Sequence, residues 1–383
     1  MLSSYLAADC AVINGSTIFQ AVLTPLALSL AGSLGSAEAQ VRTVPDRVSC
    51  GGCTVEVAFR FRFAEPPGGL GALPLQVATW SDGQRVVRLS GRPPALYRSD
   101  GRFIREVGRR GAGPGEFEVA AHFSRLPGDS ALILDSDLLR LSVLGPDMRF
   151  VRSVALPFYA TALAPTDWPR VVTVNGMSYS ADQAGWPLHA MDVSSSPARR
   201  LASFGDNDGQ LFAGRDFALV RKFFAVTTTG YWTMHVTRYQ LTRYSAAGRV
   251  EASIFRRPEW FSKDSPWSLG GPTDPPPPIL QAAAVVRDTL WVAVGIPRVD
   301  WRKAWPAIPF GARRELTAAE APEISELYRS RIEVIDLASG ALIAQRDLDG
   351  VVIDIDESLA ATVYDLDGAS VPRLQLFDLR LRR

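Results

Sequence analysis

One element recurs along almost the whole chain: a strand, a short turn centred on Gly or Asp, and a second strand. Its clearest copy is Y-R-S-D-G-R-F-I-R-E-V, at residues 97–107. Other copies lie at residues 141–154, 188–204, 241–254 and 332–346, and a sixth begins at residue 374. A strand pair cannot bury its apolar face alone, so repeated pairs must stack on one another. The repeat therefore predicts an array of similar β-sheets.

The spacing of the turns predicts the number of sheets. The first four turns lie near residues 101, 145, 196 and 248, so about 44 to 52 residues separate neighbours. That is the length of one four-stranded propeller blade. The next turn, near residue 340, is about twice as far away. Because two proline-rich stretches fill this gap and proline cannot donate to a sheet, we predict insertions near residues 257–279 and 298–325 rather than a seventh blade.

The N-terminal part of the sequence contains a strand that could complete the sixth copy of the repeated element. The sixth element, at residues 374–383, stops after its first strand, whereas T-V-E-V-A-F-R-F-R-F at residues 54–63 alternates like a strand without a local partner. Pairing the two would close the ring and protect its sheet edges. We therefore predict an all-β, six-bladed β-propeller over residues 54–383, closed by the N-terminal strand that completes the last blade.

A glycine-rich loop, Gly108–Phe117 (G-R-R-G-A-G-P-G-E-F), joins the first two predicted blades. Gly111, Gly113 and Gly115 permit the backbone angles of a sharp crossing, and the Phe117 ring can wedge between two sheets. With the strands before it, this loop resembles the NHL-type repeat of six-bladed propellers, especially of exported bacterial proteins that carry a C-x-x-C pair before the first strand. The resemblance covers residues 50–155 well, and it implies a fold but no activity.

Residues 1–39 have the features of a secretory signal peptide. An apolar run at Ile18–Leu34 is followed by Ala37-Glu38-Ala39, which fits the small-x-small pattern before a cleavage site. The run is too short and too interrupted for a retained membrane span. No Lys or Arg precedes Arg42, which is atypical of an export signal and indicates either a weak signal or a start codon placed too far upstream. We expect a periplasmic or secreted protein without a transmembrane anchor.

The lead at residues 40–53 contains Cys50 and Cys53, as C-G-G-C. In an oxidising compartment these cysteines can close a small disulfide ring. A zinc site would need a second pair of ligands, and haem attachment would need a histidine where Thr54 stands. A thioredoxin-like redox site remains the alternative, although the residues that follow alternate like a strand and not like a helix.

Charge and motifs narrow the functional classes. The 41 Lys and Arg residues balance 40 Asp and Glu residues, and no long basic run occurs, so we do not expect a nucleic-acid partner. G-x-S-x-G is absent, which argues against a serine hydrolase. The chain has three histidines, His122, His189 and His235. Only His122 is placed near an innermost strand, so we do not expect the three to share a metal ion.

Some residues could hold a metal or fasten a turn. Asn175 could line the channel, although an Asn-Gly pair favours a turn. Asp206-Asn207-Asp208-Gly209 begins like a calcium loop but lacks the later Glu, because Phe217 is at the twelfth position. Asp135 and Asp137 are expected to fasten a turn.

Aromatic residues in the two insertions are the candidate binding residues: Trp260, Trp267, Trp301 and Trp305. Aromatic side chains in loops over a rigid scaffold often contact partners, but they can equally anchor the loops. We predict a non-catalytic protein that binds an unidentified protein or small ligand and needs no cofactor. Two alternatives are a lyase- or lactonase-type enzyme with one calcium or zinc ion at the channel, and an interaction module of a cell-surface assembly.

Overall fold

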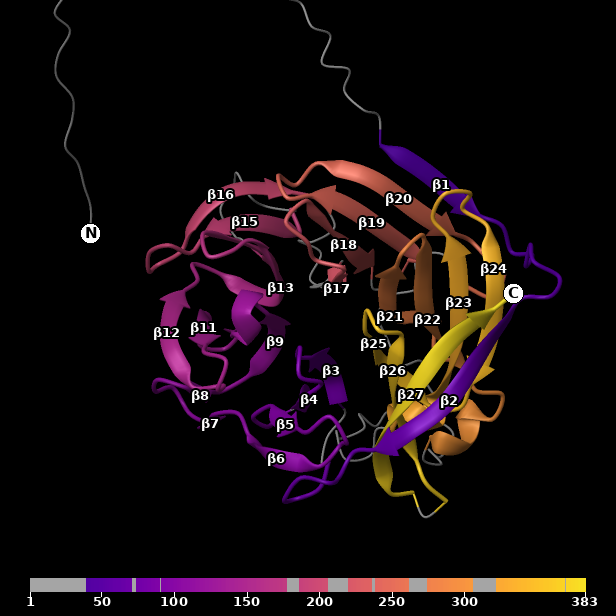
Figure 1. Ribbon diagram of the computed structural model, residues 1–383, viewed down its shortest axis with the longest axis horizontal. Coiled ribbons are helices and arrows are strands. Elements are labelled where there is room, and N and C mark those ends of the chain that lie inside the picture. Colours follow the sequence, from indigo (N-terminus) through magenta and orange to yellow (C-terminus); the bar gives the residue numbers. More distant parts are fainter. Residues whose placement is uncertain are drawn as a thin grey trace, which may run out of the picture. The chain divides into compact units, whose positions relative to one another are not determined.

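The computed structural model shows six β-sheets arranged as blades around a central channel (Figure 1). It describes residues 39–70, 74–89, 91–177, 186–205, 220–235, 238–261, 274–305, 322–368 and 370–383. Helical structure in these residues is limited to three short segments: η1 (Pro127–Asp129), η3 (Trp301–Ala304) and α1 (Ile324–Leu327). The predicted all-β, six-bladed propeller is confirmed.

The strands of each blade follow one another from the channel outward. Blade 1 contains β3 (Pro74–Thr79), β4 (Arg85–Leu89), β5 (Ala95–Tyr97) and β6 (Phe103–Glu106). Blade 2 contains β9 (Ala120–Arg125), β10 (Ala131–Asp135), β11 (Arg140–Leu144) and β12 (Phe150–Ala155). Blade 3 contains β13 (Tyr159–Asp167), β14 (Val171–Met177), β15 (Leu188–Asp192) and β16 (Arg199–Phe204).

The other half of the ring has the same plan with two additions. Blade 4 contains β17 (Val220–Phe224), β18 (Gly230–His235), β19 (Gln240–Ser245) and β20 (Val250–Arg256), and β1 (Gln40–Val44) joins its outer edge. Blade 5 contains β21 (Ile279–Val286), β22 (Thr289–Pro297), β23 (Tyr328–Asp336) and β24 (Leu342–Leu348). Blade 6 contains β25 (Val351–Ile355), β26 (Ala360–Leu366) and β27 (Pro372–Arg382), and its outermost strand is β2 (Thr54–Arg62).

Each complete copy of the repeated sequence element forms the two outer strands of one blade. The clearest copy, residues 97–107, becomes the β5–β6 hairpin, and its turn glycine, Gly101, has a φ of +85°. The corresponding glycines of blades 4 and 5, Gly248 and Gly340, have φ values of +79° and +72°. Only glycine enters this left-handed region without strain. The glycines therefore suit the turns of these three blades, whereas Met148 holds the corresponding position of blade 2 with a φ of +59°.

The ring closes through the N-terminal strand, as predicted. β2 pairs antiparallel with β27, from Thr54 opposite Arg382 to Arg62 opposite Gln375. The sixth copy thus supplies the third strand of blade 6, and a segment from the other end of the sequence supplies the fourth. This pairing covers an edge of β27 that would otherwise be open.

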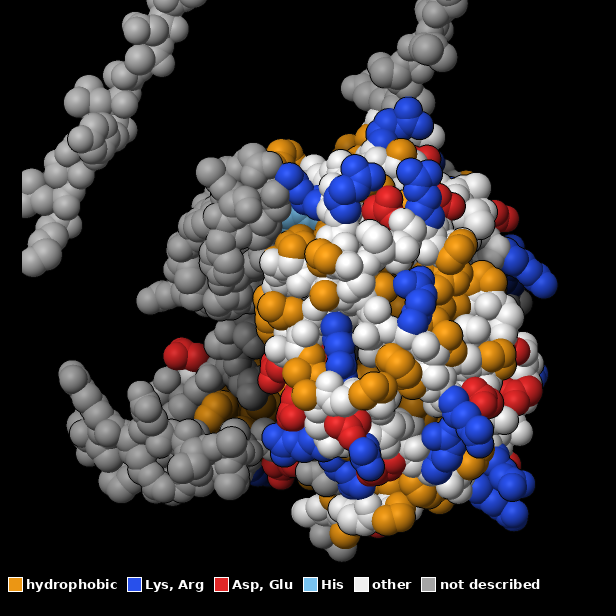
Figure 2. All heavy atoms as spheres, turned by 90° about the vertical axis from the view of Figure 1, so that its left-hand side faces the viewer, with side chains coloured by type: hydrophobic (Ala, Val, Ile, Leu, Met, Phe, Trp, Pro, Cys, Tyr) orange, Lys and Arg blue, Asp and Glu red, His pale blue; other side chains and the backbone are white. Residues whose placement is uncertain are grey.

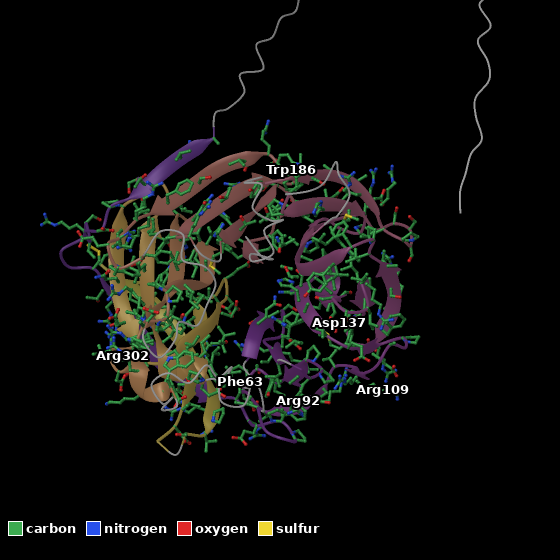
Figure 3. The ribbon with its side chains drawn as sticks, turned by 180° about the vertical axis from the view of Figure 1, so that it is seen from behind. Phe63, Arg92, Arg109, Asp137, Trp186 and Arg302 are labelled. Atoms are coloured by element: carbon green, nitrogen blue, oxygen red, sulfur yellow. A yellow bond between two sulfur atoms is a disulfide. The ribbon has the colours of Figure 1, made fainter. Side chains whose placement is uncertain are left out.

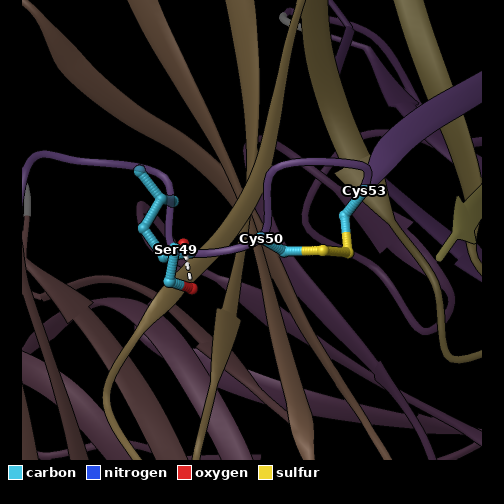
Figure 4. The surroundings of a disulfide bond; sticks show 4 residues. Ser49, Cys50 and Cys53 are labelled. Carbon is cyan, nitrogen blue, oxygen red and sulfur yellow. Dashed lines mark hydrogen bonds between the residues drawn. A yellow bond between two sulfur atoms is a disulfide. The ribbon is translucent and has the colours of Figure 1, made fainter.

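The lead before β2 also belongs to the ring, which the sequence did not indicate. β1 pairs in parallel with β20, from Gln40 opposite Ala252 to Val44 opposite Arg256. Further along, the Ser49 backbone N–H donates to the Leu342 carbonyl of blade 5 at 2.8 Å. A disulfide joins Cys50 and Cys53, with 5.4 Å between their Cα atoms, directly before β2 (Figure 4). The lead therefore contacts blades 4, 5 and 6 in succession.

The inner strands are buried on both faces because every blade is covered by two neighbours. All five residues of β10 are buried, whereas β12 at the outside of the same blade is mostly exposed or half-buried. Phe117 is 3% exposed and packs in a cluster that combines residues of blades 1 and 2, among them Trp80 and Phe123. The ring of Phe117 therefore fills the space between two sheets, as expected from its place after the glycine-rich loop.

The glycine-rich loop satisfies its own polar groups. The Gly113 N–H donates to the Glu116 carboxylate at 2.8 Å, and the Arg140 guanidinium donates to the carbonyls of Ala112, Gly113 and Glu116. The bond from the Gly113 N–H, followed by a bond from the Arg109 guanidinium at 2.6 Å, lowers the pKa of the Glu116 carboxyl. Arg109 lies at the outer rim of the ring, away from the channel (Figure 3). The loop is thus a crossing between blades at the outside of the molecule.

The alternation of strand direction gives the propeller two different ends. The connections between the first and second strands of the blades are short, for example residues 80–84 and 356–359, and we call the end where they lie the short-turn end. The two predicted insertions connect β20 to β21 and β22 to β23. Both connections start at the opposite end of the ring, which we call the long-connection end. Residues 262–273 and 306–321 of these insertions lie outside the described residues.

Blades 4 and 5 are joined by a buried charged cluster. Arg256 at the end of β20 forms an ion pair with Glu333 of β23, and the two side chains are 2% and 0% exposed. The Tyr239 hydroxyl donates to Glu333 at 2.7 Å, and burial, followed by the nearby Glu333 charge, raises the pKa of Tyr239 well above its usual value. A charge buried this deeply is tolerated only because its partner is buried with it.

Charged residues of both signs are mixed over the outside of the ring. Figure 2 shows Lys and Arg interspersed with Asp and Glu and with hydrophobic side chains on the described part of one side. In the described part of the chain, no helix is long and apolar enough to cross a membrane.

Candidate functional site

A cavity of about 360 Å³ lies in the central channel, toward the short-turn end. Its wall contains residues from the innermost strand of every blade and from three of the turns that follow these strands. A volume of this size is at the lower end of the range for small-molecule pockets. The cavity is therefore the candidate site around which the six blades converge.

The wall of this cavity has two different sides. Every polar residue in it comes from the adjacent blades 6, 1 and 2, and we call this side the polar arc: Asp354, Asp356, Glu357, Ser358, Gln76, Thr79, His122, Ser124 and Arg125. Blades 3, 4 and 5 contribute only apolar residues, and we call this side the apolar arc: Leu163, Phe223, Phe224, Ala225, Val226, Ala283, Ala284 and Val285. Consecutive blades are neighbours in the ring, so each arc is continuous.

Gln76 and His122 form the centre of the polar arc. The Gln76 side chain donates to the Phe123 carbonyl at 2.7 Å and accepts from the Phe123 N–H at 3.1 Å, which fixes the orientation of its amide. The Gln76 nitrogen lies 3.2 Å from His122 Nε2. Because an amide nitrogen only donates, His122 accepts this bond with Nε2. Gln76 thus links β3 to the edge of β9 and holds the imidazole ring in place.

The carboxylates at the mouth of the cavity fasten turns. Asp356 accepts from the Ser358 N–H and hydroxyl at 2.9 and 2.6 Å, and from the Thr79 hydroxyl of blade 1 at 3.0 Å. Arg125 forms an ion pair with Asp129 at 2.7 Å. These bonds make the mouth rigid across blades 6, 1 and 2. The polar arc is therefore shaped before any ligand arrives.

The three histidines lie in different strands of three blades, as expected. His122 is in β9, the innermost strand of blade 2. His189 is in β15, the third strand of blade 3, and His235 ends β18 of blade 4. Among the described residues, no group of three or more His, Cys, Asp and Glu side chains is arranged to hold a metal ion.

Asn175 and Asp135 have structural contacts. Asn175 lies in β14 and not in a turn, accepts from the Thr161 hydroxyl at 2.7 Å and donates to the Pro187 carbonyl at 3.0 Å. Asp135 accepts from the N–H groups of Glu118 and Leu138 at 2.9 and 3.1 Å, so it fastens a turn as predicted. The Asp206–Asp208 segment lies outside the described residues.

The tryptophans of the insertions pack against the propeller where the structure describes them. The ring centre of Trp260 lies 5.8 Å from the guanidinium carbon of Arg256 and 5.3 Å from that of Arg331. Trp301 is 5% exposed in a core cluster between blades, and Trp305 packs against the same cluster. Trp267 lies outside the described residues. These contacts anchor the insertions, and a binding role for the four tryptophans stays a prediction.

Sequence reasoning did not identify the cavity. A signal was nevertheless present: a polar residue interrupts the apolar run of the first strand in L-Q-V, A-H-F and I-D-I, at Gln76, His122 and Asp354. These three strands belong to adjacent blades. Gln281 interrupts the first strand of blade 5 in the same way, so this signal alone does not separate the polar arc from the apolar arc.

Comparisons with known proteins support the fold. No protein-family model and no curated protein matches this sequence. A solved structure of a "putative exported protein" from Bacteroides fragilis aligns with 90% of this chain and 100% of its own, at 10% identity and a TM-score of 0.57. A member of the DUF4221 family from Bacteroides vulgatus aligns with 86% of this chain and 99% of its own, at 7% identity and a TM-score of 0.56. The chain thus shares its propeller fold with these two bacterial proteins, while the NHL-type resemblance stays a prediction.

Proposed function

We propose that this chain is an exported, non-catalytic binding protein that holds a small ligand in the central cavity. The observation that carries the proposal is the division of the cavity wall into a polar arc and an apolar arc. A wall of this kind fits a molecule that is apolar on one side and polar on the other. The apolar side can then lie against the apolar arc, and the polar arc can supply the hydrogen bonds that the polar side loses when it leaves water.

The bonds of the polar arc favour binding over catalysis. Gln76 is held by two bonds to the Phe123 backbone, and Asp356 accepts from donors in two blades. General acid–base catalysis requires a side chain that exchanges protons with the substrate, whereas these groups maintain the shape of the wall. A rigid, preorganised wall lowers the entropy that a ligand loses on binding.

Two features support export. β1 begins at Gln40, so cleavage after Ala39 would leave every strand of the described structure intact. The Cys50–Cys53 disulfide suits an oxidising compartment. The proposed location is the periplasm or the medium.

The test uses a neutral fluorescent probe, phenylnaphthylamine, on protein collected from the periplasm with its mature N terminus at Gln40. The probe should bind saturably with a blue-shifted emission. Ser124→Trp places a large side chain at the cavity wall from a half-buried position and should weaken binding by about tenfold or more.

The matched control is Ser153→Trp, which adds the same side chain to an exposed position in β12 of the same blade. It should bind the probe like the wild type. Equal binding by all three proteins would contradict the proposal, as would absence of saturable binding to the wild type. Turnover of a small lactone by the purified protein would instead favour the enzyme alternative.

A further inference from the structure

Among the described residues of the cavity wall, negative charge exceeds positive charge. The carboxylates of the wall all come from blade 6: Asp354, Asp356 and Glu357. The guanidinium of Arg125 forms an ion pair with Asp129, which lies outside the wall, so its charge is already balanced. His122 accepts the bond from Gln76 with Nε2, so its ring is neutral in this arrangement. An anion in the cavity would therefore meet charges of its own sign.

Two of these carboxylates lie at different depths on the same face of blade 6. Asp356 is in the turn after β25 and faces blade 1, because it accepts from the Thr79 hydroxyl at 3.0 Å. Asp354 precedes it by two residues, and residues two apart in an extended chain project from the same face about 7 Å apart. Asp354 is 7% exposed. It therefore lies deeper in the channel than Asp356, within the wall itself.

The three carboxylates have different surroundings. Asp356 fastens its own turn through Ser358, and it acts on the buried cation of Arg85: burial lowers the pKa of Arg85, and the Asp356 charge opposes this shift. Glu357 is exposed at the mouth of the cavity, where its charge attracts approaching cations. Asp354 is the buried carboxylate of the wall. A carboxylate offers about four acceptor sites, so Asp354 can accept from a ligand as well as from the protein.

The apolar part of the wall is also compatible with a cation. Four aromatic residues line the cavity: Trp80, Phe123, Phe223 and Phe224. They come from blades 1, 2 and 4, and thus from both sides of the cavity. The face of an aromatic ring attracts a cation, and this attraction is strongest where water is excluded. An ammonium group therefore loses less than an anion when it leaves water for this cavity.

We propose that the ligand of the cavity is an organic ammonium ion whose nitrogen donates to the Asp354 carboxylate while its apolar body lies against the apolar arc. This inference rests on the proposed function and adds the charge and chemical class of the ligand to it. A channel lined by one sign of charge concentrates ions of the opposite sign. A charge-assisted bond from an ammonium to a carboxylate is stronger than a bond between neutral groups. The ligand class is that of primary amines with an apolar body.

The experiment measures how octylamine, octanol and octanoate displace phenylnaphthylamine from the wild-type protein at pH 7.5. The three molecules share one apolar body and differ in charge, since octylamine is protonated and octanoate is ionised at this pH. Octylamine should bind about tenfold more tightly than octanol, as expected from one charge-assisted hydrogen bond. Octanoate should bind more weakly than octanol because the wall carries charges of the same sign.

Asp354→Asn tests the assigned carboxylate, because it removes the charge and keeps the size of the side chain. Circular dichroism and the urea midpoint show whether it folds. Its preference for octylamine over octanol should fall to about twofold or less. Glu357→Gln changes an exposed residue, so it should fold like the wild type, and its preference should fall to about half of the wild-type value.

The matched control is Asp349→Asn. Asp349 lies in the turn before β25, at the other end of the same strand, and its side chain is 91% exposed and outside the cavity wall. This variant changes the net charge of the protein by the same amount as Asp354→Asn. It should keep the full preference for octylamine.

The outcomes separate this inference from the proposed function. If the wild type binds phenylnaphthylamine but binds octylamine no more tightly than octanol, the cavity binds ligands and the inference alone fails. A tenfold preference that survives in Asp354→Asn overturns it, as does an equal loss in Asp349→Asn. If Asp354→Asn does not fold, Glu357→Gln decides, and an unchanged preference there counts against the inference. If neither the probe nor octylamine binds, as measured for octylamine by calorimetry, the proposed function fails and the inference fails with it.

Discussion

His189 should make the stability of the propeller fall between pH 7.5 and pH 5. The side chain is 0% exposed, its Nδ1 lies 2.8 Å from the Ser203 hydroxyl and its Nε2 lies 3.3 Å from the Gly176 carbonyl. A carbonyl only accepts, so Nε2 carries the proton of the neutral ring and Nδ1 accepts from Ser203. Burial, assisted by the nearby charge of Arg200, lowers the pKa of His189 from 6.5 to about 4.

The sign and size follow from proton linkage. Between pH 6.5 and pH 4 the unfolded chain binds a proton at this residue and the folded chain does not, so acid favours unfolding. With these two pKa values, the free energy of unfolding should fall by about 2 kcal/mol between pH 7.5 and pH 5. Above pH 6.5 the residue is neutral in both states and contributes no pH dependence.

Urea unfolding of the wild type and of His189→Gln, followed by tryptophan fluorescence at pH 7.5 and pH 5, measures this contribution. The variant should be less stable at pH 7.5 but should lose about 2 kcal/mol less than the wild type on acidification. His235→Gln serves as the control, because it removes a histidine at the end of a strand in place of the buried His189. An equal loss in the wild type and in His189→Gln would refute the reasoning.

Two further substitutions, one of them with a matched control, test how the blades are joined. Gly108→Ala should destabilise the protein by about 2–4 kcal/mol, because Gly108 has a φ of +77° and an added Cβ would overlap the Gly115 carbonyl. Gly51→Ala, where the added Cβ meets nothing within 4 Å, should change the urea midpoint little. Glu333→Gln should cost about 3 kcal/mol, because Arg256 would lose its buried partner and keep the more exposed Asp46, and a loss below about 1 kcal/mol would contradict this role of the buried pair.

The sequence predicted the fold well because local chemistry repeats in it. Gly101 and Gly248 mark the same left-handed turn position in two blades, so the hairpins and their spacing could be recognised without a structure. Asp135 likewise fastens a turn with bonds to nearby residues. Such features depend on a few residues that are adjacent in the sequence, so they can be recognised without knowledge of the fold.

The site could not be predicted in the same way because it joins residues that are distant in sequence. Gln76, His122 and Asp356 meet at one wall only after six blades have closed a ring. The parallel pairing of β1 with β20 depends on the same closure, since Gln40 and Ala252 are neighbours only in the folded ring.

Closure by β2 also determines the order in which the molecule can be completed. β2 is synthesised before any blade, yet its partner β27 is synthesised last, and Arg60 and Asp378, which form an ion pair across them, are 318 residues apart in sequence. Bringing such distant segments together is an entropically costly step that slows folding. β2 must therefore stay unpaired until β27 has been synthesised, so blade 6 is completed only after the strands of the other five blades are available.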